Sequence, residues 1–364
     1  MKKILLLLLV VTLILTFASC EKEATPTPPD ENGEKVSDVV ENKDEAPDTT
    51  EPEAPSVSVT YEEAKLNSGY ICIEEFKSVA LKKDGTMVGL NDGYPIPDSV
   101  LEECGVNKQD IVKFLCAGYG YDTVALTKDG KTTRITVAND EPCLENVKDI
   151  IFSPSYSHDD NIICVMKDGR VLTTIKSLVL DERAYIDGIT DAVEATRGAD
   201  HRSVTVTHAD GTVSVWAEGD VLDQINTEQA SLLEEISGWT DIVLAHGNSG
   251  NTYLGGENYF YVGLKKDGTV VATGSYAELV KDWKNIAYID TGYGVIAGLT
   301  TDGRVLVVGE CSGEASYDGV SPTEWENVVG ISVSTEGRML GLTNDGTVIG
   351  HWRGSEGENG FGPF

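Results

Sequence analysis

From about residue 70 onward, apolar and polar residues alternate in short runs that are separated by Asp-Gly pairs. In the copy around Asp267, Val262 and Leu264 precede the pair, and Val270 and Val271 follow it. Alternation with a period of two places successive side chains on opposite faces of a strand, and an Asp-Gly pair tolerates the positive φ angles of a tight hairpin turn. Each copy therefore predicts two antiparallel strands joined by a turn.

This hairpin pattern occurs seven times, with Asp-Gly pairs that begin at Asp84, Asp129, Asp168, Asp210, Asp267, Asp302 and Asp345. A second short element precedes six of the seven hairpins, namely Gln109-Asp110-Ile111, Lys148-Asp149-Ile150, Thr190-Asp191-Ala192, Thr240-Asp241-Ile242, Lys284-Asn285-Ile286 and Glu326-Asn327-Val328. The apolar residues that follow it, such as 111–116, predict a further strand. Repeats of three or four short strands are typical of propeller blades. The sequence thus predicts an all-β fold, a seven-bladed β-propeller over residues 57–364.

The best preserved copies, 239–274 and 283–309, carry a Trp, an Asp-Ile or Asn-Ile pair, and the run Val-x-Leu or Ala-x-Leu before Lys-Lys-Asp-Gly or Thr-Thr-Asp-Gly. This pattern resembles the regulator of chromosome condensation repeat family. The resemblance implies a propeller that serves as a binding platform, without fixing what is bound. The first copy departs from the pattern because it lacks the Asp-Ile element.

Three details extend this prediction. Trp239, Trp283 and Trp325 stand at one repeat position, so packing between neighbouring blades is favoured over a sugar-stacking surface. Residues 227–236 and 98–104 predict short helices that decorate blades. The alternating stretch Val57 to Tyr61 is expected to pair, as a strand, with the open edge of the last blade, because an unpaired edge invites association.

The N-terminus has the pattern of a secretory signal. Lys2 and Lys3 precede an apolar run from Ile4 to Phe17, and Ala18 and Ser19 stand before Cys20. About 14 residues at 1.5 Å each span about 21 Å, which is too short for a hydrocarbon core of about 30 Å. The residues around Cys20 resemble a bacterial lipobox, so we expect a signal peptide over 1–19, lipidation of Cys20, and a position on the extracytoplasmic face of the cell membrane. Plain secretion is the alternative.

Residues 21–56 contain 12 Asp or Glu against three Lys, with many Pro and Thr, which predicts a disordered acidic stalk. The whole chain has a net charge of −32. Since the first 20 residues carry +2 and the stalk −9, residues 57–364 carry −25. A surface this acidic, with no basic stripe, disfavours nucleic acid as a partner.

The cysteines and histidines give no strong chemical signal. Besides Cys20 there are six cysteines without paired metal-ligand spacing, and we expect free thiols rather than disulfides, because several lie in apolar runs. His158-Asp159-Asp160 and the Asp of each Asp-Gly pair are better explained by loops and turns than by metal ligands. No catalytic motif is present, so the sequence predicts neither an enzyme nor a bound cofactor or metal.

The predicted binding face is formed by the loops that join the first and second strands of several blades. These loops combine Tyr with Gly, Ser and Asn, which recognition surfaces favour. The candidate binding residues are Tyr119, Tyr121, Tyr156, Tyr253, Tyr259 and Tyr293. Each Tyr taken singly is as well explained by packing on its own blade. The expected partner is a protein or an envelope glycan. The alternative is inhibition or regulation of an extracellular enzyme, and an enzyme with a site on the propeller face ranks after it.

Overall fold

The computed structural model describes residues 57–74, 77–82, 84–90, 96–116, 123–133, 143–153, 161–173, 184–199, 203–217, 227–249, 259–292, 294–309, 317–318, 321–334, 337–353 and 361–363. They all belong to one compact unit, Glu53–Phe364. The signal peptide, Cys20 and the stalk up to residue 56 lie outside the described residues, so those expectations stay predictions.

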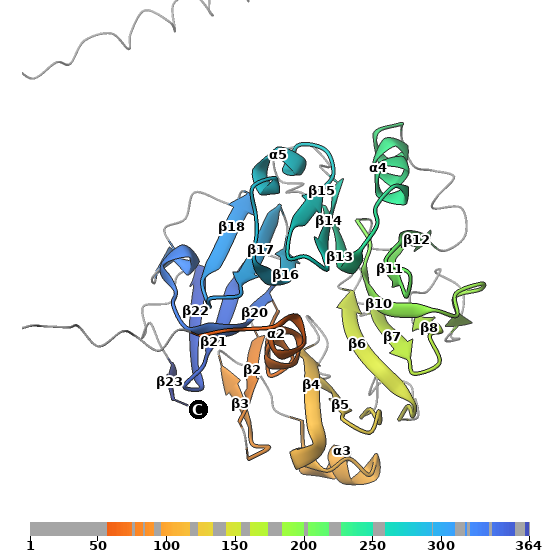
Figure 1. Ribbon diagram of the computed structural model, residues 1–364. Coiled ribbons are helices and arrows are strands. Elements are labelled where there is room, and N and C mark those ends of the chain that lie inside the picture. Colours follow the sequence, from red (N-terminus) through yellow and green to blue (C-terminus); the bar gives the residue numbers. More distant parts are fainter. Residues whose placement is uncertain are drawn as a thin grey trace, which may run out of the picture. The chain divides into compact units, whose positions relative to one another are not determined.

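Seven antiparallel sheets surround the short helix α2 (Tyr61–Ser68), and they follow one another around it in sequence order (Figure 1). Blades 1 to 3 contain β1 (Ile71–Glu74), β2 (Lys77–Leu81) and β3 (Met87–Leu90); β4 (Ile111–Cys116) and β5 (Thr123–Thr127); and β6 (Val147–Ser153), β7 (Asn161–Met166), β8 (Val171–Thr173) and β9 (Ala184–Tyr185). Blades 4 and 5 contain β10 (Ala192–Arg197), β11 (Ser203–His208) and β12 (Val213–Ala217); and β13 (Ile242–Ser249), β14 (Tyr259–Lys265) and β15 (Val270–Ala272). Blades 6 and 7 contain β16 (Ile286–Gly292), β17 (Val295–Thr300) and β18 (Val305–Gly309); and β20 (Val328–Val333), β21 (Met339–Thr343) and β22 (Thr347–Arg353), joined by β19 (Tyr317–Asp318) and β23 (Phe361–Pro363). The seven-bladed prediction is confirmed by this strand pairing.

The Asp-Gly pairs form the predicted turns. All seven glycines have φ angles between 79° and 89°, a region that glycine enters without steric cost. In five turns the Asp Oδ1 accepts a hydrogen bond from the backbone N–H two residues later, at 2.8 to 3.2 Å. These carboxylates are therefore used within the turns. We call the end of the ring where the turns lie the turn face.

Five of the seven turns are also bound to the next blade. The backbone N–H groups of Val147, Ala192, Ile242, Ile286 and Val328 donate to the carbonyl of the preceding blade's turn glycine at 2.9 to 3.0 Å. In blade 3 the residue before this donor is Asn146, with a φ of 62°, which matches Asp241, Asn285 and Asn327 in the later blades. The sequence assignment of this element to Lys148-Asp149-Ile150 was therefore wrong by three residues.

The three tryptophans pack between neighbouring blades, as predicted. Trp283 is buried with Leu264 and Val270 of blade 5, and a Cβ atom added to Gly298 would lie 2.6 Å from its Cζ3 atom. Trp239 over Gly263 and Trp325 over Gly341 repeat this arrangement. Each tryptophan needs a glycine on the middle strand of its own blade, because any side chain there would occupy the ring's space.

The prediction that residues 57–61 form a closing strand was wrong. Residues 57–60 are not in a strand, and Tyr61 begins α2. The edge of blade 7 is instead paired through β22, which bonds β19 at Tyr317–Asp318 and β23 at Phe361–Pro363. Val59 remains part of the core, since it is buried beside blades 6 and 7 and its N–H donates to the carbonyl of Thr301 at 2.8 Å.

The two predicted decorating helices are confirmed as α3 (Asp98–Glu103) and α4 (Thr227–Ser237). The described residues contain three further short helices, namely α5 (Tyr276–Val280), η1 (Lys108–Asp110) and η4 (Pro322–Glu324). None of the helices among the described residues is both long and apolar enough to cross a bilayer.

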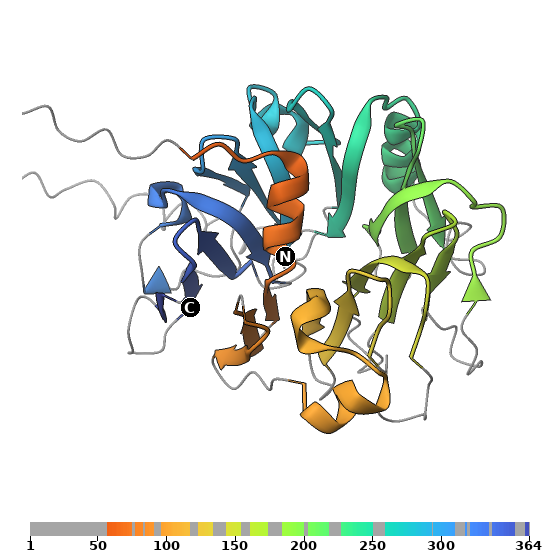
Figure 2. The same cartoon turned by 60° about the horizontal axis from the view of Figure 1, so that its bottom comes forward.

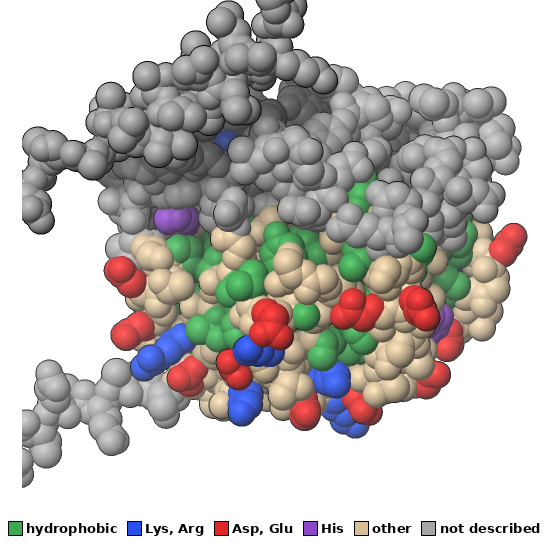
Figure 3. All heavy atoms as spheres, turned by 90° about the horizontal axis from the view of Figure 1, so that it is seen from above, with side chains coloured by type: hydrophobic (Ala, Val, Ile, Leu, Met, Phe, Trp, Pro, Cys, Tyr) green, Lys and Arg blue, Asp and Glu red, His purple; other side chains and the backbone are tan. Residues whose placement is uncertain are grey.

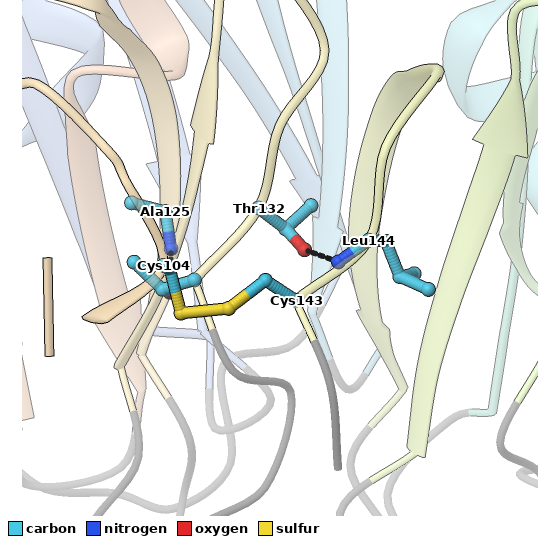
Figure 4. The surroundings of a disulfide bond; sticks show 6 residues. Cys104, Ala125, Thr132, Cys143 and Leu144 are labelled. Carbon is cyan, nitrogen blue, oxygen red and sulfur yellow. Dashed lines mark hydrogen bonds between the residues drawn. A yellow bond between two sulfur atoms is a disulfide. The ribbon is translucent and has the colours of Figure 1, made fainter. Parts of the chain in front are cut away.

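The expectation of free thiols fails for one pair. Cys104 at the end of α3 forms a disulfide with Cys143, 39 residues later, with a Cα–Cα distance of 5.7 Å (Figure 4). Neither residue lies in a strand, so the repeat pattern gave no sign of their proximity. Cys72 and Cys164 are buried among apolar side chains, as expected.

Candidate functional site

The centre of the ring is the place where all seven blades meet. Its lining comes from the innermost strand of each blade, namely β1, β4, β6, β10, β13, β16 and β20. Because these strands start at the turn face, residues at the same strand position form layers around the centre. The third residue of the strand contributes the first layer, with Lys113, Asp149, Glu194 and Tyr288.

Helix α2 covers the turn-face end of this centre (Figures 1 and 2). It begins with a capping box in which Thr60 Oγ1 accepts from the Glu63 N–H and Glu63 Oε2 accepts from the Thr60 N–H. These bonds satisfy backbone N–H donors that have no partner within the first turn of a helix. The hydrogen bond from the Thr60 N–H to the Glu63 carboxylate also lowers the pKa of Glu63. At the other end, Ser68 Oγ accepts from the Ile331 N–H of blade 7 at 3.1 Å.

Four charged groups join α2 to three blades. The Lys65 Nζ atom lies 2.9 Å from Asp149 Oδ2 on blade 3 and also pairs with Glu194 Oε1 on blade 4. Lys113 Nζ of blade 2 lies 2.8 Å from Asp149 Oδ1. Tyr61 Oη donates to Glu194 Oε1 at 3.2 Å. Two ammonium groups and two carboxylates thus satisfy one another in a cluster that we call the central ion cluster.

The burial of this cluster shifts its pKa values. Burial alone would raise the pKa of Asp149, but the ammonium groups of Lys113 and Lys65 lower it overall. Burial likewise acts to lower the pKa of Lys65, whereas Asp149 and Glu194 raise it. Burial raises the pKa of Glu194 more than Lys65 lowers it, and burial together with Glu194 raises that of Tyr61. Lys65 and Asp149 are therefore held in their charged forms.

The central ion cluster lines part of a cavity of about 130 Å³, together with His246 and Asp290. Burial raises the pKa of the Asp290 carboxyl group to about 6, although its oxygens accept from the N–H groups of Val333 and Thr291 at 2.7 and 2.8 Å. Burial lowers the pKa of His246 to about 3, so its ring is neutral at pH 7. Its Nε2 atom is inaccessible and has no hydrogen-bond partner among the described residues. Farther along the strands from the turn face, the Arg197 guanidinium donates to Asn248 Oδ1. The amide nitrogen of Asn248 in turn donates to Thr291 Oγ1 at 3.1 Å.

This arrangement binds the parts of the ring together. The ammonium groups of Lys65 and Lys113 are both paired with Asp149, and α2 covers these groups on the turn face. In the described part of the chain, no three His, Cys, Asp or Glu side chains are grouped as metal ligands. The central ion cluster is therefore best explained as the attachment of α2 to the blades.

Sequence reasoning missed this cluster, although two signals were present. Thr60 and Glu63 have the spacing of a capping box immediately before the helix. Lys113, Asp149 and Glu194 also occupy the same strand position in three successive copies. A charged residue repeated at a buried strand position is a sign that the charges meet.

Of the predicted binding residues, the structure places Tyr259 alone. It begins β14 opposite Ser249, at the end of the strand away from the Asp267 turn, and it packs partly on the cluster around Trp239. Tyr119, Tyr121, Tyr156, Tyr253 and Tyr293, together with His158-Asp159-Asp160, lie outside the described residues. The predicted ring of tyrosines therefore stays a prediction.

Comparison with known proteins supports no family assignment. No protein-family model matches the chain, and no curated protein sequence is detectably similar to it. Among solved structures, yeast RCC1 (Prp20) bound to Kap60 is 12% identical over 86% of each chain, with a TM-score of 0.46. Human WBSCR16 is 13% identical over 74% of this chain and 81% of its own, with a TM-score of 0.43. BamB from Moraxella catarrhalis is 12% identical over 80% and 84%, with a TM-score of 0.44. Similarity at this level gives no information about the function of the chain. The assignment of a seven-bladed propeller is based on the strand pairing described above.

Proposed function

We propose that this chain is a lipid-anchored, extracytoplasmic binding or scaffold protein whose propeller presents the face opposite the turn face to a protein partner. In this proposal Cys20 carries the lipid and residues 21–56 are the stalk. The proposal names no catalytic residue, because the charged groups at the centre of the ring are engaged with one another.

The observation that carries the proposal is the place where the chain enters the ring. Val59 is bound to Thr301, next to the Asp302 turn of blade 6, and α2 continues along the turn face. A stalk that ends at residue 56 therefore joins the propeller on the turn face. The incoming chain at residues 57–68 therefore occupies the turn face, and the opposite face is left for a partner.

The strand ends agree with this orientation. β4, β6, β13 and β16 run from the turn face to the opposite face, because each pairs antiparallel with the strand that leads into an Asp-Gly turn. The loops that carry the predicted tyrosines follow these four strands directly. Their attachment points are thus on the face opposite the turn face.

The net charge of the propeller limits the class of partner that it can bind. Asp and Glu side chains are spread over the described part of the face seen in Figure 3, with Lys and Arg among them. Residues 57–364 carry a net charge of −25. Such a surface repels phosphate backbones and favours neutral or basic protein surfaces. It also repels anionic lipid headgroups, which is consistent with a propeller held off the membrane by a stalk.

Mass spectrometry of the mature N-terminus tests the anchor: we expect a diacylglyceryl-modified Cys20, and an unmodified residue or cleavage elsewhere would contradict it. Cross-linking and capture from intact cells with the full chain test the partner. Changing Tyr119, Tyr121, Tyr156, Tyr253 and Tyr293 together to Ala should abolish capture of a protein. The matched control is Tyr185→Ala, since Tyr185 is 42% exposed on the edge of blade 3. Capture of a glycan instead, or equal capture by both variants, would contradict the proposal.

A further inference from the structure

Blade 4 departs from the repeat at three positions. Two residues before the Asp of its turn it has His208, where the other blades have Lys, Thr or Met. Four residues after that Asp it has Ser214, where the others have Thr or an apolar residue. Directly before its innermost strand it has Asp191, which does not share the positive φ of its counterparts in blades 3, 5, 6 and 7. The other blades form without these features, so the fold alone does not explain them.

The three side chains form one chain of hydrogen bonds across the sheet of blade 4. The His208 Nδ1 atom lies 2.8 Å from Asp191 Oδ1, and His208 Nε2 lies 2.7 Å from Ser214 Oγ. An ionised carboxylate can only accept, so Nδ1 carries a proton and donates to Asp191. In the neutral ring Nε2 then has no proton, and it accepts from the Ser214 hydroxyl. Asp191 thereby selects the tautomer in which His208 can take the proton of the serine.

The turn of blade 4 does not need His208. In blades 2, 6 and 7 a Thr stands at this position, and its hydroxyl donates to the Asp of its own turn. In blade 4 the N–H and the hydroxyl of Thr212 both donate to Asp210 Oδ1, at 2.9 and 2.7 Å. The imidazole of His208 is therefore left to connect Asp191 with Ser214.

The serine end of this chain of hydrogen bonds reaches the surface. Ser214 is partly exposed, and the side chain of His208 is 17% exposed. Among the described residues β12 pairs with β11 alone, so it is the outer strand of the sheet. The His208 N–H donates to the Thr212 carbonyl, which makes Val206 and Ser214 the next hydrogen-bonded pair. The N–H of Val215 therefore points out of the sheet edge, where it can donate to an oxygen of a group bound to Ser214.

The surroundings of Ser214 favour an uncharged substrate with an apolar group. Trp216 lies on the same face of β12, because side chains two residues apart share a face. Its ring is partly buried against the apolar cluster that includes Val204 and Val206. Asp191 and Asp210 stand on either side of His208 and repel an anion. A small acyl or aryl group can lie against the indole.

The geometry points to a nucleophilic serine site in blade 4 that hydrolyses uncharged carboxylic esters, an activity beyond the binding function proposed above. Ser214 Oγ attacks the carbonyl carbon of the ester while His208 Nε2 takes the hydroxyl proton. The bond to the leaving oxygen then breaks, and His208 gives its proton to that oxygen. The alcohol departs and the acyl group remains on Ser214.

Water completes the reaction. His208 takes a proton from a water molecule, whose oxygen attacks the acyl carbon. The bond from that carbon to Ser214 Oγ breaks, His208 returns the proton to the serine oxygen, and the carboxylic acid is released. Asp191 is a positioning residue, because it orients the ring and stabilises its protonated form.

A fluorophosphonate probe tests the nucleophile in the full chain, since an activated serine oxygen bonds to phosphorus and displaces fluoride. Peptide mass spectrometry should find the label on Ser214. His208→Thr should slow labelling of Ser214 about a hundredfold, and Asp191→Asn should slow it at least about tenfold. Ser237→Ala is the control, because Ser237 is an exposed serine at the end of α4 that donates to the Glu234 carbonyl. It should leave labelling of Ser214 unchanged.

Hydrolysis of 4-nitrophenyl acetate and melting temperatures separate catalysis from a structural role. Ser214→Val and His208→Thr introduce residues that other blades carry at these positions, so both variants should keep the melting temperature of the wild type. Both should lose the hydrolysis that the wild type shows above background. The proposal is overturned if Ser214 of the wild type carries no label, if His208→Thr is labelled at the wild-type rate, or if Ser214→Val hydrolyses the ester as fast as the wild type.

Discussion

The Lys65 Nζ atom lies 2.9 Å from Asp149 Oδ2, so the helix at the start of the propeller is bound to its third blade. Lys65→Met should lower the free energy of unfolding by about 3 kcal/mol. The substitution leaves the Glu194 carboxyl group and Asp149 Oδ2 buried without the ammonium group that they share, while Asp149 Oδ1 keeps Lys113. Urea unfolding measures this loss. The control is Lys281→Met, which breaks an exposed pair with Glu278 and should cost less than about 1 kcal/mol. Equal losses would show that the central ion cluster adds no stability.

Asp290 gives the protein a specific pH dependence. Its carboxyl group keeps its proton up to about pH 6 in the folded protein, against a pKa of 3.8 when exposed. Between these values the folded state holds more protons than the unfolded state, so this group's contribution is complete below pH 3.8 and is lost as the pH rises through 6. The loss amounts to about 3 kcal/mol.

The comparison with Asp290→Asn isolates this effect. His246 acts in the opposite sense, since its pKa is lowered to about 3 and its contribution to stability grows as the pH rises towards 6.5. Both proteins contain His246, so the difference between their unfolding free energies reports Asp290 alone. We expect the wild type to lose stability relative to the variant between pH 4 and 6, and parallel pH profiles would disprove this.

The disulfide between Cys104 and Cys143 ties the end of α3 to the segment before blade 3. For a loop of 39 residues, restriction of the unfolded chain predicts a stabilisation of about 4 kcal/mol. A variant with Cys104→Ser and Cys143→Ser should therefore unfold at lower denaturant concentration under oxidising conditions. Under reducing conditions the two proteins should unfold alike, and a persistent gap would mean that the serines disturb packing.

The packing of Trp283 against Gly298 predicts a size-compensation effect. Gly298→Ala places a Cβ atom 2.6 Å from the indole, which should cost about 1–3 kcal/mol. Gly238→Ala is the control because the nearest atom to its added Cβ lies 3.5 Å away. In a Trp283→Leu background, Gly298→Ala should cost less than in the wild type. Additive losses in this double-mutant cycle would contradict direct contact.

The repeat pattern was sufficient to predict the blades, because local chemistry determines each hairpin. The turn glycines, the alternating strands and the interblade tryptophans all follow from residues close together in the chain. The mistakes arose where the outcome depends on distant residues. Val57 to Tyr61 alternate like a strand, but the capping box of Thr60 and Glu63 and the buried partners of Lys65 favour a helix. Cys104 and Cys143 come together only because the blades place them side by side.

The candidate binding residues stay untested as a set. Tyr259, which the sequence predicts in a loop, is the first residue of β14. The partners of Lys65 could not be read from the sequence, because Asp149 and Glu194 meet it only when seven innermost strands surround one helix.

The contacts of α2 have a consequence for folding order. The helix precedes every blade in the chain, yet it packs on β16 and β20 of the last two blades. During synthesis it therefore emerges long before the surfaces that hold it exist, and its native position requires contacts over most of the domain's length. The earliest helix of the propeller is accordingly among the last parts to reach its native place, and intermediates that lack blades 6 and 7 leave Lys65, Asp149 and Glu194 hydrated.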